Sequence, residues 1–377
     1  MDADLFYRVQ VGAGPARYDL SHDLTTLEVE EREGKPSRLV VQVPDPFKVF
    51  GHAIQEGMSV EAELGTVRDH SLVFRGRVHQ VDASFPRDMV PSVTIRAHDS
   101  GMRMGLLRRN RRWTGSLSTI TSTIARDHGF HRQTIRLQGD PSFSGNGLRQ
   151  QDETDLAFLY RLAGAYGAVH HVLAGDEGDD FVFLSERDVM TSEPEVTLHH
   201  GRSRVPNRLL SFQAEADITR IQLPRLYSGI DYESGKPSEV MEAPVEEVGD
   251  REDIHLDENM TAFREREPER AKALQGLLDA APVARREVVD ELGRVQRITV
   301  PTFASPEELK TRSANQFSTR VHGMWGSGTT QGIHSLRAQR NVRIEDVGGR
   351  FSGVWFLSQV RHLLGPEGYR TELTCRR

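Results

Sequence analysis

The sequence predicts a mainly β protein that contains an insert of mixed helices and strands. Short stretches that alternate apolar and polar residues, or that are rich in β-branched residues, fill most of residues 5–97 and return near the end of the chain. Two intervening segments have the spacing of amphipathic helices. Because 377 residues are too many for one ordinary core, we expect two or three domains.

The first domain is placed at residues 1–102 and contains six expected strands. Turns rich in glycine, proline and aspartate separate these strands. Several short strands in succession predict a small antiparallel barrel or a sandwich, and the local pattern leaves that choice open. The expected strands are Phe6–Val11, Leu24–Glu30, Arg38–Val43, Ser59–Leu64, Leu72–Val81 and Val93–Ala97.

Residues 103–204 form the expected α/β module. Ser116 or Ser118 can cap a first helix, which ends at Gly129, a residue type that readily adopts the left-handed conformation found at helix ends. A second helix follows. A hairpin over residues 168–184, with glycines and aspartates in its turn, completes the module. This order predicts a pair of helices that packs against a small sheet.

The second helix of the module is the most distinctive segment of the chain. It covers residues 150–166, and either Asp152 or Thr154 can cap its first turn. Four of its residues recur at helical spacing and predict one apolar stripe that packs on a sheet. These residues are Leu156, Leu159, Tyr160 and Ala163.

The rest of the chain is expected to hold a second β domain that a charged insertion interrupts. The domain comprises residues 205–228 and 298–377 and includes a helix at 306–321. Ser305-Pro306-Glu307-Glu308 supplies the serine and the glutamate of a capping box at the start of that helix. Residues 229–297 are rich in charged residues and proline and poor in apolar residues, so we expect a partly mobile insertion.

The segment QQDETDLAFLYRLAGAYG fits a run of the form Gln-x-x-Glu-[ST]-Asp-Leu-x-Phe-Leu-x-Arg-Leu-Ala-x-x-x-Gly. The matching positions are Gln150, Glu153, Thr154, Asp155, Leu156, Phe158, Leu159, Arg161, Leu162, Ala163 and Gly167. This run is similar to a signature of the phage late control protein D family, which includes the baseplate hub proteins of contractile tails and the related VgrG proteins of type VI secretion. The end of the chain also resembles hub proteins, at His362, Gly368, Tyr369 and Thr371.

The resemblance implies a finer fold and a function. It implies two tandem small antiparallel β-barrels, similar to those of tail-tube proteins, beside the helix-containing α/β module. It also implies a homotrimeric baseplate hub, without enzymatic activity or a cofactor, that adapts the hexameric tail tube to a trimeric central spike. The implied partners are the trimeric spike protein, the first tail-tube ring, the baseplate wedge proteins and, as a further candidate, the tape measure protein. VgrG proteins continue into a spike, whereas this sequence ends at Arg377, so we expect the spike to be a separate polypeptide.

Composition limits the classes of function. The net charge of −7 argues against a general nucleic-acid binder, which needs a basic face. Cys375 is the only cysteine of the sequence, so neither an internal disulfide nor a cysteine-rich metal site can form. The N-terminus lacks the features of a signal peptide, and no segment is apolar enough to span a bilayer. We expect a protein without stable membrane insertion that is made in the bacterial cytoplasm and assembled into a phage tail or injection particle.

The sequence contains neither Gly-x-Ser-x-Gly nor His-Glu-x-x-His, the motifs of common hydrolases and zinc peptidases. The pairs His170-His171 and His199-His200 are each adjacent on an expected strand. Because adjacent strand residues point to opposite faces, neither pair can hold one ion, and we interpret them as surface or half-buried histidines. We therefore expect no catalytic, cofactor-binding or metal-binding residue.

Two other segments suggest chemistry at first sight. The acidic run at residues 176–180 lacks the spacing of a calcium-binding loop and predicts a solvated hairpin turn. The glycine-rich run Gly323–Gly328 follows a helix and has no lysine, so it predicts a hinge and not a phosphate-binding loop. The alternative function is a hub-associated peptidoglycan hydrolase that uses paired carboxylates, most of which would come from the charged insertion.

An arginine-rich run is the strongest charge feature of the sequence. It is either a docking patch for an acidic partner, where the planar guanidinium can pair with two carboxylate oxygens, or an exposed linker after the first domain. The two interpretations have equal support, and a nucleic-acid role is a distant third. The residues are Arg103, Arg108, Arg109, Arg111 and Arg112.

Overall fold

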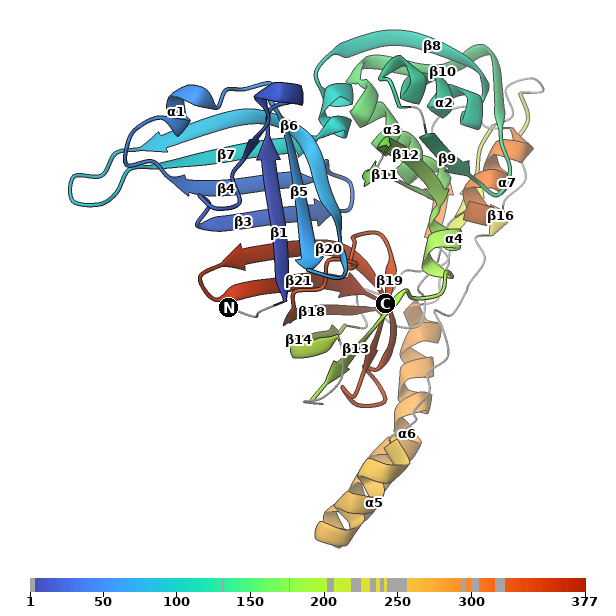
Figure 1. The fold of residues 1–377 in the computed structure, drawn as a ribbon. Coiled ribbons are helices and arrows are strands. Elements are labelled where there is room, and N and C mark those ends of the chain that lie inside the picture. The colour runs from blue at the N-terminus through green and yellow to red at the C-terminus, as the bar shows by residue number, and fades with distance from the viewer. Residues whose placement is uncertain are drawn as a thin grey trace.

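The structure is a computed structural model, and it describes residues 4–130, 132–175, 177–201, 207–217, 225–230, 235–237, 241–242, 256–292, 296–299, 305–315 and 323–377. One large sheet forms two barrel-shaped units, and the α/β module lies beside them (Figure 1). The predicted fold class is confirmed, because strands dominate and the helices of the module form a distinct layer.

The strands alternate in burial where one face meets a core and the other meets solvent. In chain order they are β1 Leu5–Val11, β2 Tyr18–Asp19, β3 Thr26–Arg32, β4 Arg38–Pro44, β5 Ser59–Thr66, β6 His70–Ser84, β7 Ser92–Asp99, β8 Arg108–Ser116, β9 Arg132–Arg136, β10 Ser142–Thr154, β11 Ala168–Gly175, β12 Gly178–Ser185, β13 Val196–His200, β14 Arg208–Ala216, β15 Arg225–Ser228, β16 Met241–Glu242, β17 Gln296–Thr299, β18 Met324–Gln331, β19 Asn341–Glu345, β20 Gly353–Gly365 and β21 Gly368–Arg376. The helices are η1 Gly14–Ala16, α1 Phe50–Ala53, η2 Ser100–Gly105, α2 Leu117–Asp127, α3 Asp155–Tyr166, α4 Glu186–Met190, α5 Leu256–Arg266, α6 Pro268–Leu292 and α7 Pro306–Asn315.

The first barrel consists of β1 to β7. Its strands follow the order β3-β4-β7-β6-β5-β1-β2, and every pair is antiparallel. Alternate residues of β7 are buried, and the apolar ones, Val93, Ile95 and Ala97, form one core with residues of the other strands such as Val9, Leu27 and Phe74. β1 and β3 share no ladder in the described part of the chain, so this barrel remains open between them.

The second barrel is closed. Its strands follow the order β19-β13-β14-β18-β21-β20, and β20 pairs back with β19. Trp355, Met324 and Leu357 are fully or almost fully buried in its core. The structure differs from the predicted antiparallel barrel at one strand, because β13 runs parallel to both β14 and β19. Local alternation fixes which face of a strand is buried but not its direction relative to distant strands.

A single strand, β20, joins the two barrels. Its first residues, Gly353–Phe356, pair with β19 of the second barrel. Residues 359–364 pair with β3 of the first barrel, and the register of β20 against β21 shifts between these two segments. The two barrels therefore belong to one continuous hydrogen-bonded sheet, which fixes their relative position.

The α/β module has the two helices and the hairpin that the sequence predicts. Helices α2 and α3 lie between the sheet β11-β12-β9 and a ribbon made of β8 and β10 (Figure 1). The Ser116 hydroxyl accepts a hydrogen bond from Thr119 N at 3.2 Å and caps α2, and Gly129 follows the helix with a φ of +75°. The β8–β10 ribbon was not predicted, because its arginine- and glycine-rich residues do not alternate in hydrophobicity.

Helices α5 and α6 lie within the charged insertion and project away from the barrels as a rod (Figure 1). Arg264 Nη2 on α5 donates to Gln275 Oε1 on α6 at 2.8 Å, so the two helices pack side by side where they meet. Residues 231–234, 238–240, 243–255 and 293–295 of the insertion lie outside the described residues. Among the described helices, none combines the length and the apolar character that a membrane span requires.

Two predicted elements differ from the structure. Gly323–Gly328 was predicted as a hinge, but residues from Met324 onward form β18 in the second barrel. The glycines are needed there because a Cβ on Gly326 would lie 2.7 Å from the Phe212 ring, which packs across the strand. The helix predicted at 306–321 is described as far as Asn315, and residues 316–321 lie outside the described residues.

The pairing of strands bears on the proposed domain boundaries. β13, which falls in the segment 103–204, contributes to the second barrel. β15 falls within the segment 205–228, and β17 crosses the boundary between residues 297 and 298. β15 pairs with both β16 and β17, and the three strands form a separate small sheet. We therefore propose that the module ends before Val196 and that the small sheet accompanies the insertion of residues 229–297.

Candidate functional site

The helix that carries the family-like signature, α3, ends where the sequence predicts but begins later, because residues 150–154, predicted as helix, belong to strand β10 and pair with β8. The Thr154 hydroxyl accepts a hydrogen bond from Ala157 N at 3.2 Å, so Thr154 and not Asp152 is the cap. Gly167 ends the helix with φ +61° and ψ +48°, the left-handed conformation that favours glycine. A defined start and end place the signature residues at one corner between β10 and the helix.

The carboxylate of Asp155 is the centre of a buried polar cluster at that corner. Gln150 Nε2 donates to Asp155 Oδ1 at 2.7 Å, and His128 Nε2 lies 2.8 Å from Oδ2. Trp113 Nε1 in turn donates to Gln150 Oε1 at 3.0 Å, and the Arg109 guanidinium makes an ion pair with Asp155 at 3.2 Å. Burial alone would raise the pKa of Asp155, but the hydrogen bonds from His128 and Gln150 outweigh it and lower the pKa.

Glu153 and Arg161 form a second, more exposed contact of the same corner. Arg161 Nη2 donates to Glu153 Oε1 at 2.5 Å and to the carbonyl of Arg149 at 2.7 Å. The Arg161 guanidinium also lies 5.0 Å from the centre of the Phe158 ring. The polar positions of the signature therefore bind the helix to the strand before it, and their contacts are structural.

The apolar face of α3 is rotated from the predicted stripe. Leu159 and Ala163 are buried as predicted, but Leu156 and Tyr160 are only half buried. Two aromatic residues and one leucine complete the buried face: Phe158, Tyr166 and Leu162. Tyr166 extends the contacts of α3 beyond the module, because its hydroxyl donates to Glu308 Oε1 on α7 at 2.7 Å.

The five arginines of the candidate docking patch do not share one environment. Three make ion pairs within the chain, Arg108 with Asp152, Arg109 with Asp155 and Arg111 with Asp127, at distances of 3.1 to 3.3 Å. Arg103 and Arg112 are exposed, and neither makes an ion pair with the described residues. The candidate patch for an acidic partner is therefore best represented by Arg103 and Arg112.

A buried charge pair lies where the two barrels meet. Arg337 Nε donates to Glu31 Oε1 at 2.6 Å, and Ala338 N donates to Oε2 at 2.9 Å. Burial would raise the pKa of Glu31, but the Arg337 charge and hydrogen bond outweigh burial and lower it. His362 on β20 lies beside this pair, and its Nε2 is 3.1 Å from the Leu336 carbonyl oxygen. The resemblance points to His362, and its Nδ1 lies 2.9 Å from the hydroxyl of Tyr369 on β21.

A small cleft, with a cavity volume of about 20 Å³, lies where the two barrels and the α/β module meet. Asp99 lies in it as a buried carboxyl that accepts hydrogen bonds from Ser37 N at 2.6 Å and Gly101 N at 2.9 Å, and burial raises its pKa to about 7. His170 and His171 also line the cleft, and burial lowers the pKa of each to about 4. His171 is half buried, as predicted, whereas His170 is more deeply buried than predicted.

Cys375 and the acidic turn at residues 176–180 both lie in structural contexts. The Cys375 thiol is fully buried in the second barrel, and burial raises its pKa, which disfavours the reactive thiolate. In the acidic turn, Glu177 makes an ion pair with Arg132 at 2.6 Å, and Asp176 lies outside the described residues. The remaining acids of that turn belong to β12.

Exposed apolar side chains gather at the far end of the first barrel. They come from the segment after β4 and from the connection between β6 and β7. A hydrogen bond that Asp45 N donates to the Pro91 carbonyl at 2.7 Å joins these two segments. Exposed fractions of 56% to 85% are unusual for such residues and are typical of an interaction surface. We call these residues the apolar tip: Phe47, Val49, Phe85, Met89 and Val90.

No protein-family model matches the chain, and no curated protein matches it in sequence. Its fold does match solved structures. A tail protein from Neisseria meningitidis MC58 has 13% sequence identity and a TM-score of 0.63, and the match covers 98% of this chain and 96% of that one. The 43 kDa tail protein of prophage MuSo2 from Shewanella oneidensis has 12% identity and a TM-score of 0.59, with 99% and 98% of the two chains covered.

A third similar structure comes from another system. It is an E. coli component of the type VI secretion system, described as similar in structure to the T4 bacteriophage tail proteins gp27 and gp5. It has 11% identity and a TM-score of 0.54, and the match covers 94% of this chain and 73% of that one. At such low identities the likeness establishes the fold alone. Over almost its whole length, the chain has the fold of the two tail proteins from Neisseria and Shewanella.

Proposed function

We propose that the chain is a structural baseplate hub protein of a contractile tail or contractile injection system. As a homotrimer, it adapts the hexameric tail tube to a trimeric central spike. The observation that carries this proposal is the continuous sheet through β20, which holds two barrels side by side in one chain. Three chains then present six barrels, and the six can mate with a hexameric ring while the trimer keeps threefold symmetry for the spike.

The open edge of the first barrel supports an assembly of this kind. Residues 5–8 of β1 pair with β5 on one side, but on the other side β2 pairs only with Gln10 and Val11. An unpaired edge favours pairing with another chain, and a head-to-tail contact between identical subunits gives a ring when the rotation between them closes. We propose that this edge pairs with a neighbouring subunit.

The other surfaces have proposed partners in the same assembly. The apolar tip would contact the first tail-tube ring, because exposed apolar area is stabilised when another protein covers it. Arg103 and Arg112 would pair with carboxylates of a neighbouring subunit. The rod of α5 and α6 would contact baseplate wedge proteins, since it projects away from both barrels. In this assembly the protein is part of the virion or injection particle.

The mass of the purified chain, alone and mixed with the candidate spike protein, tests the proposed function. Light scattering should give complexes that contain three copies of the 42.4 kDa chain when the spike is present. A complex with one, two or six copies per trimeric spike would contradict the hub. Replacing residues 256–292 with a short Gly-Ser linker should leave the trimer intact and abolish wedge binding. Loss of the trimer would contradict the role given to the rod.

The alternative is a peptidoglycan hydrolase that uses paired carboxylates. A catalytic acid of that class needs surroundings that keep it protonated, and the acids of residues 260–280, where the structure describes side-chain burial in the rod, are exposed. These acids are Glu265 on α5, Glu267 between the two helices, and Glu269 and Asp279 on α6. Zymography on peptidoglycan with the purified chain separates the two functions. Cleared bands that disappear when specific acids are replaced would favour the hydrolase.

A further inference from the structure

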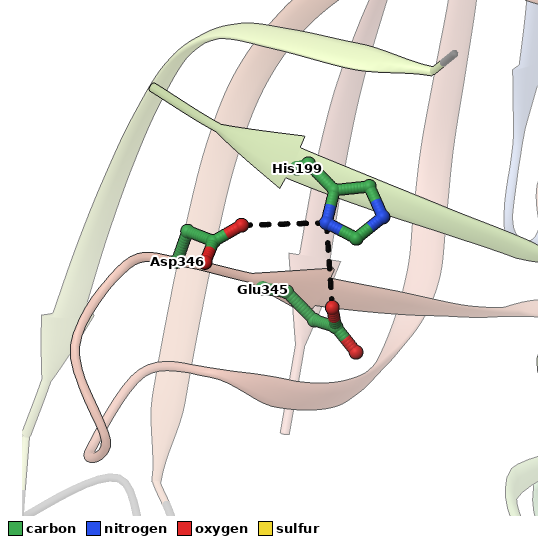
Figure 2. Close-up of side chains that lie close together, drawn as sticks. All are labelled: His199, Glu345 and Asp346. Atoms are coloured by element: carbon green, nitrogen blue, oxygen red, sulfur yellow. Dashed lines mark hydrogen bonds and ion pairs between the residues drawn. The ribbon is translucent and has the colours of Figure 1, made fainter. Parts of the chain in front are cut away.

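One histidine and two carboxylates converge at an end of the second barrel. His199 lies on β13, Glu345 is the last residue of β19, and Asp346 begins the turn that follows (Figure 2). His199 and Glu345 are directly opposite each other in the parallel ladder, so their side chains share one face of the sheet. His200 points to the other face. Among the described residues, these three form the one such group.

The three donor atoms have the spacing of metal ligands. His199 Nδ1 lies 3.3 Å from Glu345 Oε2 and 3.3 Å from Asp346 Oδ2, and all three atoms lie within 4.8 Å of one another. Ligands at about 2.1 Å from a zinc ion in tetrahedral or octahedral geometry are separated by roughly 3.0 to 3.4 Å. Both distances to the imidazole therefore match coordination of one ion.

An ordinary ion pair explains this arrangement less well. Charge-assisted N–H···O bonds are usually about 2.7 to 2.9 Å long, and Nδ1 has a single proton to donate. Here both carboxylates approach the same nitrogen atom at the same longer distance (Figure 2). Without a cation, the two carboxylates also repel each other. A cation among the three atoms would relieve that repulsion.

The environment leaves room for an ion and its water. The side chains of His199 and Asp346 are 21% and 16% exposed, and that of Glu345 is 37% exposed. The donors are thus held by the barrel but remain accessible. A site with three protein ligands keeps one or more positions for water.

We propose that His199, Glu345 and Asp346 bind a divalent transition-metal ion of the zinc class. Imidazole with carboxylates is a ligand set that zinc accepts, whereas sites built only from oxygen favour magnesium or calcium. The ion stabilises the closed barrel. β13 pairs with β14 through only two residue pairs, and His199 takes part in both of the ladders that hold β13. A metal bond to β19 and its turn would strengthen this weak closure. The site does not depend on the proposed role in a tail.

Isothermal titration of ZnCl₂ into the full chain, stripped with EDTA and free of any histidine tag, tests the site. We expect one ion per chain and a higher thermal unfolding midpoint with zinc. His199→Ala and Asp346→Asn should each weaken binding by roughly tenfold or more and remove the zinc-dependent shift of the midpoint. Asparagine suits position 346 because it has nearly the shape of aspartate and tolerates the φ of +66° found there.

His200→Ala is the matched control, because it removes the neighbouring imidazole from the opposite face of β13. It should bind zinc as the wild type does. Glu345→Gln preserves the shape of its side chain, so it serves as the test if His199→Ala does not fold. Equal zinc binding by the wild type, Asp346→Asn and Glu345→Gln would mean adventitious binding elsewhere and would overturn the proposal. Failure of the stripped wild type to bind zinc would also overturn it.

Discussion

Glu31 on β3 and Arg337, which precedes β19, form a buried ion pair although 306 residues separate them in sequence. The pair joins the first barrel to the segment that leads into the last strands of the second barrel. It lies beside β20, the strand that both barrels share. Two features therefore fix the relative position of the barrels. One is the hydrogen-bonded ladder between β20 and β3, and the other is the buried Glu31–Arg337 ion pair.

Removing one partner of this pair should be costly. Glu31→Gln leaves the Arg337 charge buried without its counter-ion, and we expect a loss of about 3 to 5 kcal/mol in the free energy of unfolding, measured by urea titration. Glu63→Gln is the matched control, because its partner Arg8 has a side chain that is 43% exposed. The control should lose no more than about 1 kcal/mol. Similar losses in the two variants would show that the buried pair does not hold the barrels together.

Acid should destabilise the fold between about pH 6.5 and pH 4. Burial lowers the pKa of His170, His171 and His362 to about 4, so in this window the unfolded chain binds more protons than the native chain, and stability falls as pH falls. Asp99 acts in the opposite direction, because burial raises its pKa to about 7 and its contribution is lost as pH rises. Three histidines outweigh one carboxyl. The net loss from pH 7 to pH 5 should be roughly 3 kcal/mol.

His362→Gln tests the origin of this acid sensitivity. The variant removes one of the three protons that drive it, so the difference in unfolding free energy between pH 7 and pH 5 should shrink by roughly 2 kcal/mol. His52→Gln replaces an exposed histidine and should leave the difference unchanged. An unchanged difference in His362→Gln would contradict the assignment.

Much of the first barrel could be predicted from sequence, and the reason is physical. Six strands were predicted at residues that match β1, β3, β4, β5, β6 and β7, because alternation directly reports a strand with one buried face. The β8–β10 ribbon and the direction of β13 could not be predicted in this way. Both depend on pairing between distant segments, and local alternation carries no information about the partner or its direction.

The candidate sites were predictable to different degrees. The signature helix was predicted with Thr154 as one of two candidate caps, because a cap and the residues after it act over one or two turns. Its start was placed too early, at Gln150, since residues 150–154 pair with the distant strand β8. The cluster at His199 was not identified, since Asp346 lies 147 residues away and only the barrel brings them together. The argument that His199 and His200 cannot share an ion is consistent with their positions on β13. That argument did not predict the contacts of His199 with Glu345 on β19 and with Asp346 in the following turn.

The cap of α3 should make a measurable contribution. Thr154→Ala removes the hydroxyl that accepts from Ala157 N, and we expect a loss of about 1 kcal/mol in unfolding free energy. Thr154→Ser keeps that hydroxyl and should stay within about 0.5 kcal/mol of the wild type. If the alanine and serine variants are equally stable, the side-chain cap does not stabilise the signature helix.

Two glycines should respond oppositely to alanine. In Gly326→Ala the new Cβ would lie 2.7 Å from the Phe212 ring and 3.0 Å from the Cys375 sulfur, so we expect a loss of about 1 to 3 kcal/mol. Gly164 lies in α3 with open space around its Cα, and Gly164→Ala should gain about 0.5 to 1 kcal/mol. Thermal unfolding measures both. Adding Phe212→Ala should reduce the cost at position 326, and an undiminished cost would exclude the ring as its cause.

The most direct test of the account is a cryo-EM map of the chain assembled with its spike protein. The account predicts three copies around one axis, with both barrels of every copy facing that axis in a ring of six. A ring in which only one barrel of each chain faces the axis, or a ring with a number of copies other than three, would contradict it.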